Sequence, residues 1–104
     1  MEAAISSGKE YMQPYAQIHI DRFNTNHFLR IFDEKVKEEE LVWHRDKRER
    51  SIHVLEGKGW KIQFDNELPT ELEKGKYYVI PEMDYHRVIK GEGSLILEIE
   101  EKEE

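Results

Sequence analysis

Cysteine is absent from this chain of 104 residues. Disulfide bonds, thiolate metal ligands and a cysteine nucleophile are therefore excluded. Long apolar runs are absent too. No stretch approaches the roughly 20 residues of a transmembrane helix, and the N-terminus lacks the apolar centre of a secretory signal. We therefore expect a cytoplasmic protein that does not enter a membrane.

An excess of basic residues is also missing. The chain carries 16 Lys and Arg against 23 Asp and Glu, which gives a net charge of −7 at pH 7. Nucleic acids and anionic membranes attract basic surfaces, so neither is an expected partner. The length allows one domain with one core. We expect that domain to bind a small molecule.

Long helical periodicity is the third absence. Short runs instead alternate between apolar and polar residues, most clearly in residues 60–64 and 94–99. The predicted strands are residues 17–20, 27–32, 41–44, 51–56, 60–64, 76–80, 85–90 and 94–99. Many short strands with regular turns predict an all-β sandwich or barrel. We assign residues 1–13 to a flexible arm, 14–100 to the barrel and 101–104 to an acidic tail.

Two segments, residues 43–46 and 75–86, contain the side chains best suited to bind a metal. His44 and Asp46 are two residues apart, so on a strand they point to the same face. His86 follows a turn marked by glycine and proline. Two histidines and one carboxylate are the ligand set of many non-haem iron sites. If the fold brings His86 to the other two, we expect a divalent metal there, Fe(II) first, with Mn, Ni or Zn as alternatives.

The same segments resemble the two sequence motifs of the cupin superfamily. Val54-Leu55-Glu56-Gly57, preceded by a histidine-bearing strand, resembles the first motif. Gly75-x5-Pro81-x-Met83-x2-His86 resembles the second. The resemblance implies a small double-stranded β-helix, or jelly-roll barrel, in which His44, Asp46 and His86 are metal ligands. More weakly, the chain resembles uncharacterised cupin-like proteins of tailed phages.

The chain departs from the cupin pattern at four positions. One is Lys90, where the family has an asparagine, and the other three lie near the expected site. Asp46 stands where the family has a second histidine, Arg50 where it has a glutamate ligand, and Met83 where it has a glycine. A guanidinium cannot bind a metal. Two alternatives therefore stay open for Asp46: it is a metal ligand, or it forms an ion pair with Arg48 or Arg50.

His-x-Asp…His is also similar to the iron-binding pattern of 2-oxoglutarate-dependent oxygenases. Those enzymes carry an Arg or Lys beyond the last histidine that grips the cosubstrate, and the corresponding position here is Ile96. Arg50, Arg87 or Lys90 are possible substitutes. The chain is short for that family, so a small cupin is the better match.

Five further residues are expected to line a substrate pocket. They are Arg50, Trp43, Gln63, Tyr78 and Tyr85. Aromatic rings and hydroxyls there would select a small ligand. Our main hypothesis is a metal-dependent dioxygenase of a small polar molecule, assembled as a homodimer through a sheet edge. The alternative is a metal-free, non-enzymatic cupin in which Arg50, with the histidines, binds a sugar acid or phosphate.

Overall fold

The computed structural model describes residues 13–103 as an all-β fold, which confirms the predicted fold class. Its elements are β2 (Ala16–Asp21), β3 (Asn24–Phe32), the 3-10 turn η2 (Glu38–Glu40), β4 (Arg50–Lys58), β5 (Lys61–Phe64), β6 (Thr70–Glu71), β7 (Tyr77–Ile80), β8 (His86–Ile89) and β9 (Glu92–Glu101). The expected N-terminal arm lies outside the described residues, apart from Gln13. β9 runs to Glu101, one residue beyond the expected end of the barrel.

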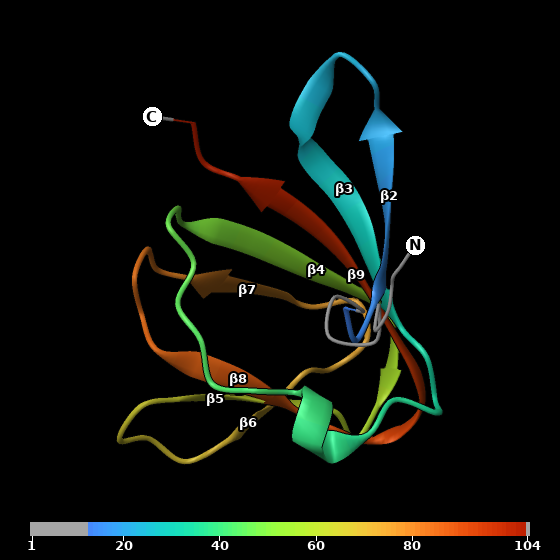
Figure 1. The fold of residues 1–104 in the computed structure, drawn as a ribbon, viewed down its shortest axis with the longest axis vertical. Helices are drawn as coiled ribbons and strands as arrows, with labels where there is room; N and C mark the ends of the chain where they lie inside the picture. Colours follow the sequence, from blue (N-terminus) through green and yellow to red (C-terminus); the bar gives the residue numbers. More distant parts are fainter. Residues whose placement is uncertain (1–12, 104) are drawn as a thin grey trace, which may run out of the picture.

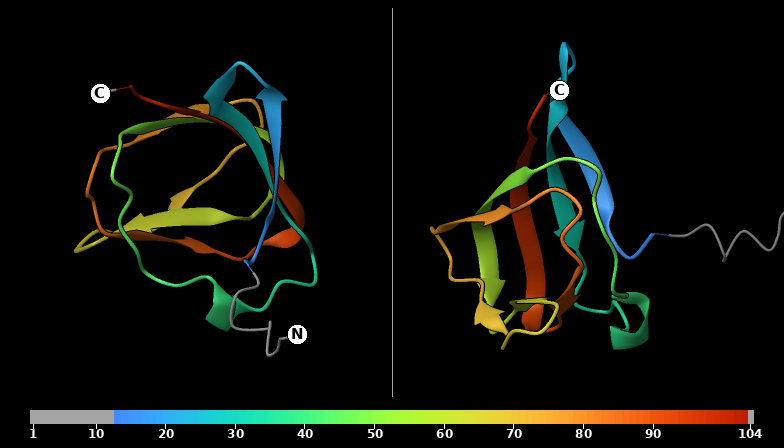
Figure 2. Two further views of the ribbon diagram at one scale, coloured as in Figure 1. Left: turned by 45° about the horizontal axis from the view of Figure 1, so that its top comes forward. Right: turned by 90° about the vertical axis from the view of Figure 1, so that its left-hand side faces the viewer.

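Two antiparallel sheets face each other across the core (Figure 1). The larger has the strand order β2-β3-β9-β4-β7 and the smaller the order β6-β5-β8. β9, the last strand in sequence, lies between β3 and β4, so the C-terminal segment is the central strand of the larger sheet. Figure 2 shows how the curved larger sheet and the smaller sheet enclose a barrel.

Apolar side chains from both sheets form the core of the barrel. Leu95, Leu97 and Ile99 alternate along β9 and are at most 4% exposed, and Ile62 on β5 meets them from the other sheet. Trp60 is fully buried and its indole N–H donates to the carbonyl of Glu92 at 3.2 Å. Removal of these side chains from water drives the two sheets together. The alternation seen in the sequence therefore predicts the core faces correctly.

The predicted strand at residues 41–44 is wrong. The chain makes the η2 turn, and from there to residue 46 only His44 pairs, through an isolated bridge to His86. Leu41 is buried and Val42 is 59% exposed, and the segment meets β8 at His44 alone. Among residues 13–103 no helix is long and apolar enough to span a membrane.

Candidate metal centre

The isolated bridge between His44 and His86 brings the two imidazoles together. The N–H of each residue donates to the carbonyl of the other at 2.9 Å. Residues directly opposite each other in an antiparallel pair project to the same side. The two rings consequently lie with their centroids 4.4 Å apart. A single backbone contact thus joins two side chains that are far apart in the sequence.

Asp46 completes this group, as its spacing from His44 predicts. Its carbonyl accepts the N–H of Met83 at 2.7 Å, which fixes its backbone beside the turn before β8. Asp46 Oδ1 lies 3.6 Å from His44 Nε2, and Asp46 Oδ2 lies 3.3 Å from His86 Nε2. One donor atom from each residue falls within 4.8 Å of the others. Donors that share an ion at about 2 Å are separated by about 3 to 4 Å, so the spacing suits a metal.

Both histidines are held in the tautomer that a metal requires. The Nδ1–H of His44 donates to the carbonyl of Val42 at 3.0 Å, and that of His86 to the carbonyl of Asp84 at 2.7 Å. A carbonyl only accepts, so the hydrogen of each neutral ring is on Nδ1 and the lone pair is on Nε2. Metal-bound histidines are oriented in the same way by such contacts. In the neutral form of the rings, the two lone pairs therefore face the carboxylate of Asp46.

The carboxylate of Asp46 is buried, with a side chain 9% exposed, and its Oδ2 has no hydrogen-bond partner in the described part of the chain. Burial alone would raise the pKa of Asp46. The nearby ring of His86 and the charge of Arg50 outweigh burial and hold that pKa below its usual value. A buried anionic oxygen without a donor is costly. A bound cation would satisfy it, so the residues present fit a metal.

Arg50 points into the barrel and is already paired. Its Nη1 lies 3.2 Å from Asp46 Oδ1, while Nη2 and Nε lie 2.7 and 2.8 Å from Oε2 of Glu101. The two roles that the sequence left open for Asp46 are thus divided between its oxygens: Oδ1 faces Arg50, and Oδ2 faces His86. Glu101, expected in the acidic tail, is the main partner of Arg50.

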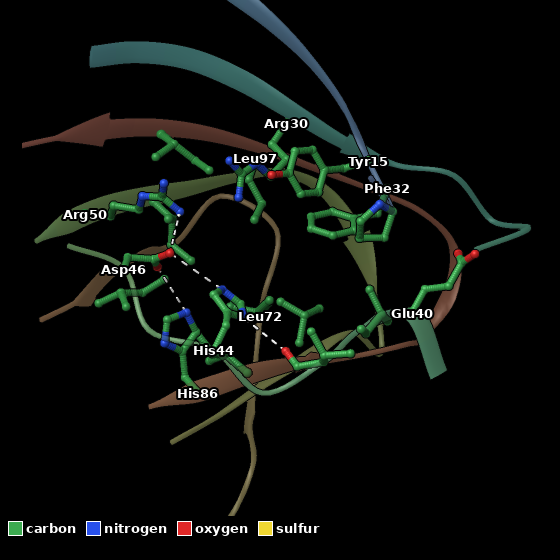
Figure 3. A pocket seen from close by; sticks show the side chains of 18 residues that line it. Tyr15, Arg30, Phe32, Glu40, His44, Asp46, Arg50, Leu72, His86 and Leu97 are labelled. Carbon is green, nitrogen blue, oxygen red and sulfur yellow. Dashed lines mark hydrogen bonds and ion pairs between the residues drawn. The ribbon is translucent and has the colours of Figure 1, made fainter. Parts of the chain in front are cut away.

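A cavity of about 200 Å³ opens beside the three candidate ligands (Figure 3). Its walls are mainly aliphatic and come from both sheets. The apolar lining residues are Phe32, Leu41, Val42, Ile52, Ile62, Leu72, Ile80, Val88, Leu97 and Ile99. Arg30, Arg50, Tyr15 and Glu40 are the polar groups on the wall besides the candidate ligands. The site can therefore hold a small molecule with a mostly apolar body.

Trp43 and Tyr85 do not line this cavity, contrary to our expectation. Each is next in sequence to a candidate ligand, and neighbouring residues on extended chain point to opposite faces. The two rings stack on each other outside, with centroids 5.3 Å apart. The guanidiniums of Arg87 and Arg45 cover Trp43 and Tyr85 at 4.9 and 4.6 Å.

Gln63 and Tyr78 are also outside the cavity lining. Gln63 accepts two hydrogen bonds from Arg87, because its register places it opposite that residue and away from Phe64 and His86. The hydroxyl of Tyr78 donates to the carbonyl of Glu71. Of the expected pocket residues, the structure brings only Arg50 to the site.

Arg30 and Tyr15 line the cavity but were not among the expected residues. The sequence does indicate that the Arg30 side chain faces the interior. Phe28, Arg30 and Phe32 alternate along one strand, and both phenylalanines are buried. An arginine at that spacing faces inward with them.

Comparisons with solved structures identify the fold. No family model matches the chain, and no curated protein matches it. Among solved structures, an RmlC-like cupin from Methanocaldococcus jannaschii is similar at 10% identity and a TM-score of 0.63, over 85% of this chain and 79% of that one.

Two further structures are similar over most of this chain. KdgF from a Halomonas species has 17% identity and a TM-score of 0.65, over 89% of this chain and 84% of that one. The DMSP lyase DddQ from Ruegeria pomeroyi has 10% identity and a TM-score of 0.72, over 96% of this chain and 51% of that one. The chain thus has the fold of the cupin superfamily, a small double-stranded β-helix.

Proposed function

We propose that this protein binds one divalent first-row metal ion through His44, Asp46 and His86 and oxygenates a small molecule held in the adjoining cavity. The observation that supports this most directly is the buried, unpartnered Oδ2 of Asp46, which lies 3.3 Å from His86 Nε2, while the other oxygen of the carboxylate lies 3.6 Å from His44 Nε2. Fe(II) is the metal that a set of two histidines and one carboxylate favours, and when bound it would supply reactivity toward dioxygen. Mn, Ni and Zn are the alternatives.

The protein's own groups have separate tasks in this proposal. The carbonyls of Val42 and Asp84 orient the two imidazoles. Arg50 keeps Asp46 ionised, since its charge lowers the pKa of that carboxyl. The aliphatic walls of the cavity exclude water and hold the apolar part of the substrate.

A metal-free anion-binding protein is the second candidate function. The observation in its favour is that two guanidiniums, those of Arg30 and Arg50, line the same cavity. Fold likeness does not choose between the candidates, because one fold supports several chemistries; the similar structures include a lyase.

Anaerobic calorimetric titration with Fe(II), Mn(II) and Ni(II) tests the proposal. We expect one ion per chain for the wild type, and dioxygen uptake by the Fe(II)-loaded protein in a screen of small organic acids. If none of the three metals binds to the wild type and all bind tightly to the Arg50→Glu variant, the natural site is an anion pocket. That result would remove the oxygenase proposal and favour the second candidate.

We further propose a homodimer formed at the edge of the larger sheet. Within residues 13–103, β2 is an edge strand whose six residues are all exposed, and they include Ile18 at 53% and Ile20 at 46%. Exposed edge strands pair readily with other chains. Light scattering should give a dimer mass, and an Ile18→Lys change should shift it to the monomer.

A further inference from the structure

Arg30 is a charged residue on the inner face of the larger sheet. It lies on β3 between two buried phenylalanines, Phe28 and Phe32, and its side chain lines the cavity. β3 belongs to the larger sheet and β8, which carries His86, to the smaller one. Figure 3 shows the side chains of Arg30 and His86 on different walls of the cavity. The cavity therefore has a cation on one wall and the candidate metal ligands on another.

The guanidinium of Arg30 has no carboxylate partner within residues 13–103. Its Nε and Nη2 both donate to one oxygen, Oε1 of Gln17, at 3.2 and 2.8 Å. Its charge lies over the rings of Tyr15 and Phe28, at 3.8 and 5.5 Å from their centroids. A guanidinium has five N–H donors, so several stay available for a ligand in the cavity.

Burial makes this unpaired charge costly. It lowers the pKa of the Arg30 guanidinium, an effect that Tyr15 only partly opposes. Arg50 differs in this respect, because two carboxylates surround it. An anion in the cavity would therefore gain more from Arg30 than from Arg50.

We propose that Arg30 binds the carboxylate of a short aliphatic carboxylic acid, whose apolar body lies along the cavity wall toward His44 and His86. This inference rests on the proposed function in one respect: the ligand occupies the same cavity. The planar guanidinium matches the two oxygens of a carboxylate. The lining of the cavity includes Ile52, Leu97 and Ile99, which suits an aliphatic chain.

The charges around the cavity favour a single carboxylate. Of the two guanidiniums on the cavity wall, that of Arg50 is paired with carboxylates and that of Arg30 is not within residues 13–103, which leaves one positive charge for one carboxylate. Glu40 does not compete for Arg30, because its carboxylate is exposed and accepts the backbone N–H of Lys37. A phosphate ester carries more charge than one unpaired guanidinium can match.

Pentanoate is a suitable probe, with pentanamide and pentylammonium as neutral and cationic analogues of the same shape. Affinities are measured by protein-observed NMR titration of the full chain, metal-free and Zn(II)-loaded. We expect pentanoate to bind at least about tenfold more tightly than either analogue, because only the anion forms charge-assisted hydrogen bonds. Pentylphosphonate should bind more weakly than pentanoate.

Arg87 provides a matched control for Arg30. Its Nε and Nη2 also donate to one glutamine oxygen, Oε1 of Gln63, and its charge also lies over an aromatic ring. Arg87 does not line the cavity. Arg30→Gln should lower the affinity for pentanoate at least about tenfold. Arg30→Lys should lower this affinity less, and Arg87→Gln should leave it unchanged.

The outcomes separate this inference from the proposed function. Metal titration of Arg30→Gln should match the wild type; if no metal binds to either protein while pentanoate still requires Arg30, only the proposed function fails. Equal binding of pentanoate and pentanamide, equal losses in Arg30→Gln and Arg87→Gln, or tighter binding of the phosphonate would each overturn the inference. If Arg30→Gln does not fold, the comparison of the probes on the wild type and on Arg30→Lys decides.

Discussion

The molecule contains two groups of two histidines and one carboxylate, and only one of them suits a metal. The inner cluster is His44, Asp46 and His86. The outer cluster is His27, Glu98 and His53, on the outer face of strands β3, β9 and β4. In the outer cluster each oxygen of Glu98 meets one imidazole, at 2.7 and 3.3 Å.

The difference lies in where the polar atoms point. Among residues 13–103, only the inner cluster brings one donor atom from each residue within 4.8 Å of the others. Its Nδ1–H groups are used by backbone carbonyls, and one carboxylate oxygen is unpartnered. Glu98 is satisfied by its own histidines. Composition alone therefore does not define a metal site; orientation and an unmet need for charge do.

The largest expected effect separates the two clusters directly. Asp46→Asn removes the anionic ligand without changing its shape, and His44→Ala removes an imidazole that is partly exposed. Each should lower the affinity for Fe(II) or Mn(II) at least about 100-fold in anaerobic calorimetry. Glu98→Gln and His53→Ala are the matched controls and should bind metal like the wild type. Equal losses in the controls would contradict the assignment.

Arg50→Glu sharpens the comparison by adding a carboxylate to the inner cluster. We expect metal affinity to rise at least about tenfold. The free energy of unfolding of the metal-free variant should fall by about 3 kcal/mol or more, because Asp46 and Glu101 lose a partly buried partner and gain a like charge. Urea unfolding with and without Mn(II) measures both. Arg50→Gln should be destabilised with no comparable gain in affinity; an equal gain would mean that Arg50 only repels the metal.

The outer cluster should stabilise the fold at neutral pH and lose this effect in acid. Hydrogen bonds from His27, then His53, lower the pKa of Glu98 from its ordinary value of 4.5. Stability from a lowered carboxyl pKa is present above the ordinary value and is lost as the pH falls through the folded value. Wild type should exceed Glu98→Gln by less than about 1 kcal/mol at neutral pH, and urea unfolding should show this advantage disappearing below pH 4.5. A gap independent of pH would contradict this account.

The smallest effect concerns the turn that supports the inner cluster. Met83 has a φ of +64°, a left-handed conformation that disfavours side chains, and it stands where cupins have glycine. Met83→Gly should stabilise the fold by up to about 1 kcal/mol without changing metal affinity. Met83→Ala keeps the strain and should not be stabilised. Differential scanning calorimetry of the three proteins compares them.

Much of this structure is predictable from the sequence, for local reasons. Alternation in residues 60–64 and 94–99 identifies core strands, and the spacing of His44 and Asp46 puts both on one face. The same alternation also applies to Trp43 beside His44, to Tyr85 beside His86 and to Arg30 on its own strand. It places the two aromatic rings outside the cavity and Arg30 inside it. The errors at Trp43 and Tyr85 came from assigning aromatic residues to the pocket by type instead of by position.

Other features depend on pairings that no local pattern reveals. Glu101 reaches Arg50 because β9 and β4 pair in a register that sets the two residues opposite each other. Residues 41–44 look like a strand by composition, yet only His44 pairs, with His86 at the start of β8. Long-range register decides both, and it follows from the assembled sheets.

Imidazole ¹⁵N chemical shifts during titration with Zn(II), a diamagnetic substitute for Fe(II), test the central claim most directly. The metal-free protein should show His44 and His86 with hydrogen on Nδ1. One equivalent of Zn(II) should then shift their Nε2 signals and leave His27 and His53 unchanged. Shifts at His27 and His53, or no shift at any histidine, would contradict the assignment of the inner cluster as the metal site.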